Sequence, residues 1–245
     1  MLRSSDGPEG QLKNAVPQEV ARIGEVMSTY RPPWALAGGW AVDAWLGRPT
    51  REHGDVDLAV FVNDRRALFE HLAGWQSIAH EETKENEGAE LWDGRALVLP
   101  AHMHARPPEE SGPLPERFDD SGMRVLFPSD GFWLDICLCE RFPEGLSGQT
   151  SGAAGSEWVL NREPRAALSL AECIRESGWG LPTVVPEVLL FYKATLYVGT
   201  KNHLRPNDEA DFVALLPLLS EEQRQWLRET ASRVYEGEHP WVGRL

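Results

Sequence analysis

The chain has 245 residues and a mass of 27.4 kDa, enough for one large domain or two small ones, each with a hydrophobic core. Its 38 acidic and 24 basic side chains give a net charge of −14, so most of its surface would repel a nucleic acid. Hydrophobic residues make up 42% and charged residues 25%, which is ordinary for a soluble globular protein and argues against a disordered or fibrous chain.

Cysteine content and hydropathy bear on where the protein resides. The three cysteines form an odd and sparse set that fits reduced core thiols better than a disulfide framework. No run approaches the roughly 20 apolar residues that cross a bilayer, and the first residues lack the apolar stretch of a secretory signal. We therefore expect a cytoplasmic protein with no membrane partner.

The N-terminal part predicts a tail followed by helix, strand and helix. Residues 1–16 are polar and rich in Gly and Ser, as in a flexible tail. From Pro17 onward, apolar residues at helical spacing predict an amphipathic helix. A short apolar strand over 34–37 leads through a Gly-Gly pair into a helix over 40–46.

The next region mixes strands with a long polar stretch. The run DVDLAVFV over 55–62 alternates as a strand does, and a helix over 64–73 follows it. Residues 96–99 predict another strand. The stretch 100–122 is crowded with Pro, Gly and charge, which predicts a mobile surface excursion.

A change in composition divides the chain. Two more strands are predicted over 123–127 and 132–140, before the Gly/Ser-rich run at 145–156. Beyond that run the pattern becomes helical, so we expect a first domain over 17–150 and a helical C-terminal domain over 151–245. The fold class predicted is α+β, followed by an α-helical half.

Three helices are predicted in the second half. The first begins at Pro186 and carries Lys193, and the second covers about 208–216. Ser220 with Gln223 three residues later forms a capping box that begins the last helix.

Three aspartates form the strongest candidate site. Asp55 and Asp57 share one face of a strand, and Asp135 lies between apolar residues of another. Carboxylates brought together and partly removed from water need a cation, and hard oxygen ligands select Mg²⁺ or Mn²⁺. The alternative is that Asp55 and Asp57 flank a strand end in solvent while Asp135 pairs with an arginine.

Gly38 and Gly39 precede a helix just upstream of these carboxylates. A helix start presents unpaired N–H groups and a positive dipole end, so a polyphosphate can bind there. A packing or turn role is the alternative for a bare Gly-Gly pair. Neither a GxxxxGK[ST] nor a GxGxxG motif occurs, which disfavours a P-loop or a dinucleotide-binding fold.

The stretch GGWAVDAWLGRPTREHGDVDLAVF at 38–61 resembles the fingerprint of antibiotic nucleotidyltransferases in the DNA polymerase β superfamily, namely aminoglycoside 2''-adenylyltransferases and lincosamide nucleotidyltransferases. Leu134 and Asp135 match the family's later Leu-Asp, and segments 186–194 and 205–212 resemble its helical part. The positions that fit the fingerprint are Gly38, Gly39, Trp40, Asp43, Gly47, Arg51, His53, Asp55 and Asp57.

The resemblance implies a polymerase β-like mixed sheet with flanking helices and a two-metal transfer. Asp55, Asp57 and Asp135 are then the catalytic and metal-binding residues, with two Mg²⁺ ions and ATP as co-substrate. The nucleotide-binding residues implied are Gly38, Gly39, Arg51, His53 and Lys193. The chain departs from the superfamily in having Gly39 where Ser is frequent and Asn207 where a basic residue is frequent.

Individual residues keep alternative interpretations. Arg51 and Lys193 could form plain surface salt bridges, and His53 could be a loop-packing histidine. A structural role is the expectation for Asp43, near the start of its helix. His102 and His104 lie two residues apart in a Pro-rich stretch without further ligands, which disfavours a metal site there.

The function predicted is transfer of AMP from ATP to a hydroxyl of a small antibiotic. Most of the net negative charge lies in the first 150 residues, which favours a cationic acceptor such as an aminoglycoside over a lincosamide or an RNA. Two other classes stay open: a toxin-type nucleotidyltransferase acting on tRNA or protein, and a non-catalytic nucleotide-binding module.

Overall fold

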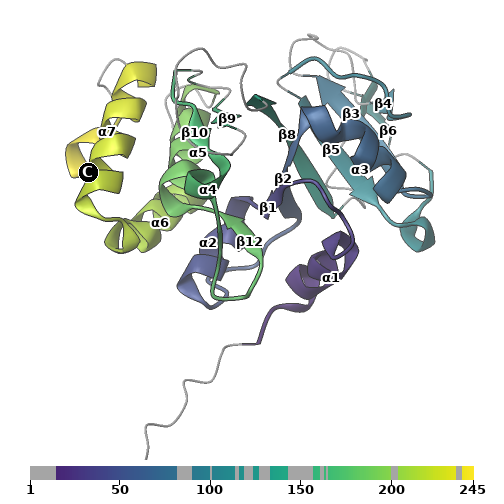
Figure 1. The fold of residues 1–245 in the computed structure, drawn as a ribbon, viewed down its shortest axis with the longest axis horizontal. Helices are drawn as coiled ribbons and strands as arrows, with labels where there is room; N and C mark the ends of the chain where they lie inside the picture. The colour runs from purple at the N-terminus through teal and green to yellow at the C-terminus, as the bar shows by residue number, and fades with distance from the viewer. Residues whose placement is uncertain are drawn as a thin grey trace, which may run out of the picture.

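A large mixed sheet forms the centre of the molecule, and helices flank it (Figure 1). The structure is a computed structural model, and it describes residues 15–81, 90–99, 101–113, 116–118, 124–126, 133–142, 157–160, 163, 165–199, 204–235 and 239–245. The sheet strands, in spatial order, are β11 (Ile174–Glu176), β12 (Pro182–Val184), β1 (Trp34–Leu36), β2 (Val56–Phe61), β8 (Leu134–Phe142), β5 (Ala101–Arg106), β3 (Gln76–Glu81) and β4 (Glu90–Leu91).

Smaller strands complete this part of the fold. Strands β9 (Glu157–Val159) and β10 (Leu168–Ser169) extend the sheet from the far end of β8. A separate two-stranded sheet consists of β6 (Glu116–Phe118) and β7 (Arg124–Leu126). Strand pairs β2–β8 and β1–β12 are parallel, and the other neighbours in the sheet are antiparallel.

Helices α3 on one side and α5 to α7 on the other lie toward opposite ends of the sheet, while α1 and α2 pack near its middle (Figure 1). In Figure 1, α3 crosses the end formed by β3 and β5, while α5, α6 and α7 pack together on the opposite side. The helices are α1 (Gln18–Met27), α2 (Gly38–Leu46), α3 (Arg65–His71), α4 (Leu170–Cys173), α5 (Pro186–Gly199), α6 (Pro206–Leu215) and α7 (Glu221–Tyr235). The 3₁₀ turns are η1 (Val62–Asp64), η2 (Pro108–Glu110), η3 (Leu216–Leu218) and η4 (Val242–Arg244).

The predicted α+β class is confirmed, as are most of the predicted elements. Helix α1 buries the apolar stripe that predicted it, including Val20 and Ile23. Strands β1, β2 and β8 and helices α2, α3, α5 and α6 form where their patterns predicted them. The capping box also forms, because Ser220 and Gln223 exchange hydrogen bonds between side chain and backbone at the start of α7.

Two predictions in the middle of the chain were wrong. The stretch 100–122 does not run only over the surface, because residues 101–106 form β5 between β8 and β3. Residues 96–99 form no strand; Leu97 is buried, and the Val98 N–H donates to the Glu81 carboxylate at 2.8 Å. Strand β3 was missed altogether.

The predicted division at about residue 150 crosses the sheet. Strand β12 belongs to the second half, yet Thr183 pairs in parallel with Leu36 of β1. The Gly/Ser-rich run at 145–156 and residues 1–14 of the expected tail lie outside the described residues. The division into 17–150 and 151–245 therefore stays a prediction, while α5 to α7 account for its helical character.

None of the helices within the described ranges has the length and apolar character needed to cross a bilayer.

Candidate active site

Two aspartates face each other across the central strands. Asp57 near the start of β2 and Asp135 of β8 are register partners in the parallel pair, so their side chains lie on the same face. Asp55 precedes Asp57 by two residues, which places it on that face as well. The three carboxylates of the sequence prediction therefore converge.

Strand β5 adds histidines to the same face. His104 lies opposite Asp135 and His102 opposite Cys137, in the antiparallel pair that β5 makes with β8. The Nδ1 atoms of His102 and His104 each lie 3.7 Å from Oδ1 of Asp135. The sequence interpretation missed these contacts because it placed both histidines in a loop, although the alternation His-x-His is itself a strand signal.

Burial and repulsion between the neighbouring carboxylates raise the pKa values of Asp55 and Asp57. Burial, with the neighbouring charges of Asp135 and Asp55, raises the pKa of Asp57 to about 7. Burial and the charge of Asp135 also raise the pKa of Asp55. Oδ1 of Asp135 is buried and accepts no hydrogen bond from the described part of the chain. Such a set is stabilised by a cation, and its all-oxygen donors fit Mg²⁺.

The Gly-Gly pair makes room for the carboxylate face. Helix α2 begins at Gly38, which adopts φ +58°, and this glycine abuts the Asp57 carboxylate. A Cβ atom on Gly39 would lie 2.4 Å from the His53 ring and 2.5 Å from Nη2 of Arg51. Both glycines are therefore required by close packing at the N-terminus of a helix.

Asp43 positions the loop between α2 and β2. Its buried carboxylate accepts hydrogen bonds from the Thr50 hydroxyl at 2.5 Å and His53 Nε2 at 2.7 Å. Burial raises the pKa of Asp43, but the hydrogen bonds from His53 and Thr50 outweigh this effect and the pKa lies below its usual range. The arrangement agrees with the structural role expected for Asp43. It also holds His53 in place, and the His53 ring packs at a tilt of 38° against Trp40, with ring centroids 4.3 Å apart.

A cationic cluster of Lys193, Arg205 and Arg51 lines a cavity with the carboxylates, and its first two members come from the helical half. Lys193 of α5 is nearly buried, with 10% of its side chain exposed, and its Nζ lies 2.7 Å from Asp211 and 3.3 Å from Asp208. Arg205 binds Asp208 through two nitrogens, at 2.5 and 3.0 Å. Arg51 approaches Asp211 at 3.7 Å. These are not plain surface salt bridges, because both aspartates are buried.

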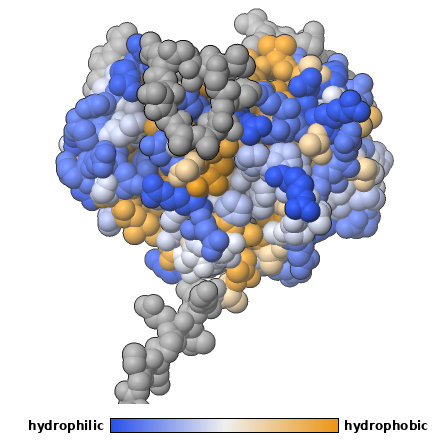
Figure 2. Space-filling view, in the orientation of Figure 1, coloured by the Kyte–Doolittle hydropathy of each residue, from blue (hydrophilic) through white to orange (hydrophobic). Residues whose placement is uncertain are grey.

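One cavity of about 630 Å³ connects the two groups. Its walls also include aromatic and aliphatic side chains, among them Trp158 and Tyr192. On the face of the molecule drawn in Figure 2, apolar surface lies near the middle, between polar flanks. The cavity is large enough for a small-molecule ligand. Its lining includes these predicted site residues: Gly38, Gly39, Arg51, Asp55, Asp57, Asp135 and Lys193.

His53 lies behind Gly39 and does not belong to the cavity lining. Arg205 is a cavity residue that the sequence interpretation missed. Its position two residues before Asn207, where superfamily members often have a basic residue, was the available signal.

Comparison with known proteins relates part of this chain to nucleotidyltransferases. Residues 19–87 match the family model described as aminoglycoside-2''-adenylyltransferase. Proteins named 2''-aminoglycoside nucleotidyltransferase from Escherichia coli and Klebsiella pneumoniae are each 51% identical to the chain over 47 residues. The resemblance inferred from the sequence is thereby confirmed for this segment.

The matched stretch is 18% of this chain, and it spans a quarter of the length of these curated relatives. A solution structure of the antibiotic-resistance factor ANT(2'')-Ia aligns over 89% of this chain and 91% of its own, with a TM-score of 0.53 and 15% identity. The lincomycin-bound lincosamide adenylyltransferase LnuA aligns over 84% of this chain and 99% of its own, at a TM-score of 0.46 and 14% identity. The alignment with ANT(2'')-Ia shows that the two chains share a fold.

Proposed function

We propose that this protein transfers AMP from ATP to a hydroxyl of a small antibiotic, with an aminoglycoside as the favoured acceptor. The pairing of Asp57 with Asp135 across parallel strands, beside the glycine start of α2, carries the proposal. It joins two segments 78 residues apart in the sequence into one carboxylate face. The match of residues 19–87 to the aminoglycoside-2''-adenylyltransferase family supports the same activity.

The carboxylates would hold magnesium and activate the acceptor. Asp55, Asp57 and Asp135 are the residues that would bind Mg²⁺, which when bound neutralises the triphosphate and the charge that develops on the leaving group. Asp135 receives the proton of the acceptor hydroxyl. The acceptor oxygen then bonds to the α-phosphorus, and the bond from that phosphorus to the bridging oxygen of pyrophosphate breaks.

The cationic cluster would bind the leaving pyrophosphate. Lys193, Arg205 and Arg51 line the same cavity as the carboxylates. Two buried aspartates neutralise part of their charge and fix their geometry, so three cations against two anions leave one net positive charge. A preorganised positive group stabilises the charge that accumulates on the β- and γ-phosphates.

The acceptor class follows from charge and from relatives. A net charge of −14 attracts a polycationic sugar and disfavours tRNA. The curated relatives carry names that specify an aminoglycoside and its 2'' position. A lincosamide acceptor is the second candidate, because its acceptor hydroxyl would face the same carboxylates.

Incubation with ATP labelled at the α-phosphate, Mg²⁺ and separate pools of aminoglycosides, lincosamides, bulk tRNA and protein tests the proposal. We expect label on an aminoglycoside, and none with Asp135→Asn, whose folding is checked by circular dichroism. Label on tRNA or protein would indicate a toxin-type enzyme. Nucleotide binding without transfer to any pool would indicate a binding module and contradict the proposal.

A further inference from the structure

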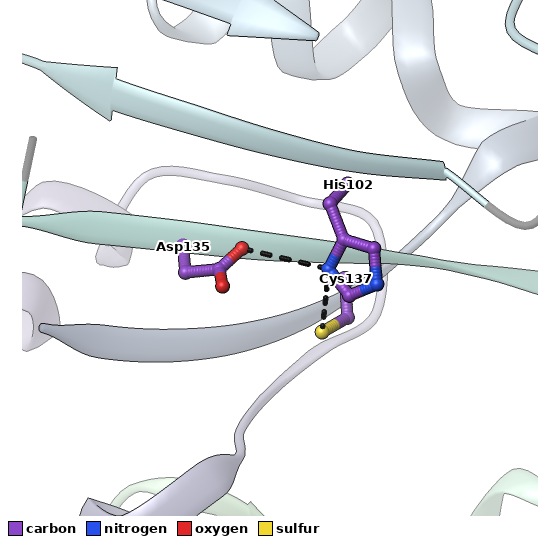
Figure 3. A group of neighbouring side chains, drawn as sticks. All are labelled: His102, Asp135 and Cys137. Atoms are coloured by element: carbon purple, nitrogen blue, oxygen red, sulfur yellow. Dashed lines mark hydrogen bonds and ion pairs between the residues drawn. The ribbon is translucent and has the colours of Figure 1, made fainter. Parts of the chain in front are cut away.

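A second kind of ligand set lies beside the carboxylates. His102 Nδ1, Cys137 Sγ and a carboxylate oxygen of Asp135 all lie within 4.8 Å of one another (Figure 3). They come from β5 and β8, whose pairing places His102 opposite Cys137 and leaves Asp135 two residues before that cysteine. Neighbouring strands of one sheet therefore hold the three donors in place without any loop.

His102 and Cys137 are hydrogen-bonded, whereas the separation of His102 from Asp135 is longer than a hydrogen bond, and both separations suit ligands of one ion. The Nδ1 atom of His102 lies 3.7 Å from Asp135 Oδ1 and 3.6 Å from Cys137 Sγ. In a tetrahedral zinc site, bond lengths of about 2.0–2.3 Å place neighbouring N and O ligands about 3.4 Å apart and N and S ligands about 3.6 Å apart. A hydrogen bond between nitrogen and oxygen is shorter, at about 2.7–3.2 Å.

The donor types select the metal. Thiolate sulfur and imidazole nitrogen are poor ligands for Mg²⁺ but strong ones for Zn²⁺. Oδ1 of Asp135 is buried and receives no hydrogen bond from any described residue, so an acceptor position is available. All three residues line the cavity, which gives an ion a path from solvent and leaves a fourth coordination position for water.

We propose that His102, Asp135 and Cys137 form a zinc-binding site, and that zinc bound there blocks nucleotidyl transfer by engaging Asp135. The inhibitory consequence rests on the proposed function, whereas zinc binding does not. On binding, the Cys137 S–H proton is released to solvent as sulfur bonds to the metal. The Asp135 carboxylate then coordinates zinc, so it can no longer take the proton from the acceptor hydroxyl.

Binding is measured first, on the full chain stripped of metal and without nucleotide. We expect one Zn²⁺ per chain in competition with a chromophoric chelator, and a near-ultraviolet thiolate-to-metal absorption band when Co²⁺ is used instead. Cys137→Ser should abolish that band and weaken zinc binding by at least about tenfold. His102→Ala should weaken zinc binding by a similar factor. Cys137→Ala serves if the serine variant does not fold.

Matched controls separate this site from neighbouring groups. Cys139→Ser removes another buried thiol on β8 that is outside the cluster, and it should keep the cobalt band. Asp55→Asn removes a carboxylate of the proposed magnesium site and none of the zinc ligands, and it should still bind one zinc. A wild-type protein without the cobalt band, or equal zinc affinity in Cys137→Ser, would overturn the site.

Inhibition is measured second, by transfer assays with excess Mg²⁺. Stoichiometric Zn²⁺ should suppress the wild-type rate by at least about tenfold and leave the Cys137→Ser rate nearly unchanged. Zinc binding without inhibition would overturn the regulatory consequence and leave the site standing. A protein that binds zinc but transfers nothing, even without zinc, would contradict the proposed function alone.

Discussion

A Cβ atom on Gly38 would lie only 1.7 Å from Oδ2 of Asp57. Small side-chain movements cannot relieve such an overlap. Any larger residue at position 38 must therefore displace the Asp57 carboxylate or the start of α2. The backbone of Gly38 also has φ +58°, which L-residues adopt at a cost. Gly38 at the start of α2 and Asp57 near the start of β2 are therefore packed too closely for a side chain to fit between them.

Gly38→Ala should lower kcat/KM for nucleotidyl transfer by at least about 100-fold, because the displaced Asp57 no longer matches Asp135. Gly47→Ala is the matched control, since Gly47 also has a positive φ but a Cβ there would meet nothing within 4 Å. It should cost about 1 kcal/mol of stability and leave turnover unchanged. Wild-type turnover in Gly38→Ala would contradict the pairing.

The pH dependence of the free energy of unfolding should reflect the raised pKa of Asp57. Its pKa is about 7 in the folded protein, and about 3.9 is usual in an unfolded chain. Between these values the folded state holds a proton that the unfolded state has lost, so without metal the free energy of unfolding falls as pH rises from about 4 to about 7.

Asp57→Asn should remove this dependence. The difference in free energy of unfolding between the wild type and the variant should change by about 2 to 4 kcal/mol between about pH 4 and about pH 7. Urea titrations at several pH values in the presence of a chelator measure it. Parallel pH profiles for the two proteins would show that Asp57 titrates normally.

Lys193→Met should raise KM for ATP by at least about tenfold, since the proposed contact with the leaving phosphates is lost. It should also lower the free energy of unfolding by about 3 kcal/mol, because Asp208 and Asp211 stay buried with less compensation. The double variant Lys193→Met with Asp211→Asn should recover part of that stability but not the KM. Unchanged KM in a folded Lys193→Met protein would exclude the phosphate contact.

Asp43 should act through the loop that it binds. Asp43→Ala leaves His53 and Thr50 without their common acceptor, which we expect to cost about 2 kcal/mol and to raise KM for ATP while kcat stays within about twofold. Thr50→Val is the control, since it removes one of the two bonds and should cost about 1 kcal/mol. A large loss of kcat with unchanged KM would place Asp43 in the chemical step instead.

Much of the carboxylate face was predictable from the sequence because its signals are local. The alternation of residues 55–62 placed Asp55 and Asp57 on one face, and the apolar run around Asp135 indicated a buried strand. Their juxtaposition needed the family resemblance, since strand order is set by packing between distant segments. Local signals also located α5 and its Lys193, through Pro186 at the start of the helix.

The remainder depended on contacts that no local pattern encodes. Strand β5 is flanked by Pro-rich sequence and carries polar residues such as His102, which lines the cavity, so composition alone predicted a surface loop. Residues 96–99 are apolar because Leu97 fills the core from an irregular segment, not because they pair as a strand. The ion pairs of Lys193 with Asp208 and Asp211 required the relative placement of α5 and α6.

The parallel pairing of Leu36 with Thr183 joins strands that the ribosome makes almost 150 residues apart. During synthesis, one edge of β1 has no strand to pair with until β12 leaves the ribosome. Its backbone N–H and C=O groups stay unpaired until then, and completion of the sheet is slowed. Because α5 follows β12 directly, the same late event brings in Lys193. The nascent protein would therefore complete the basic side of the cavity, to which Lys193 belongs, only in the final stage of folding.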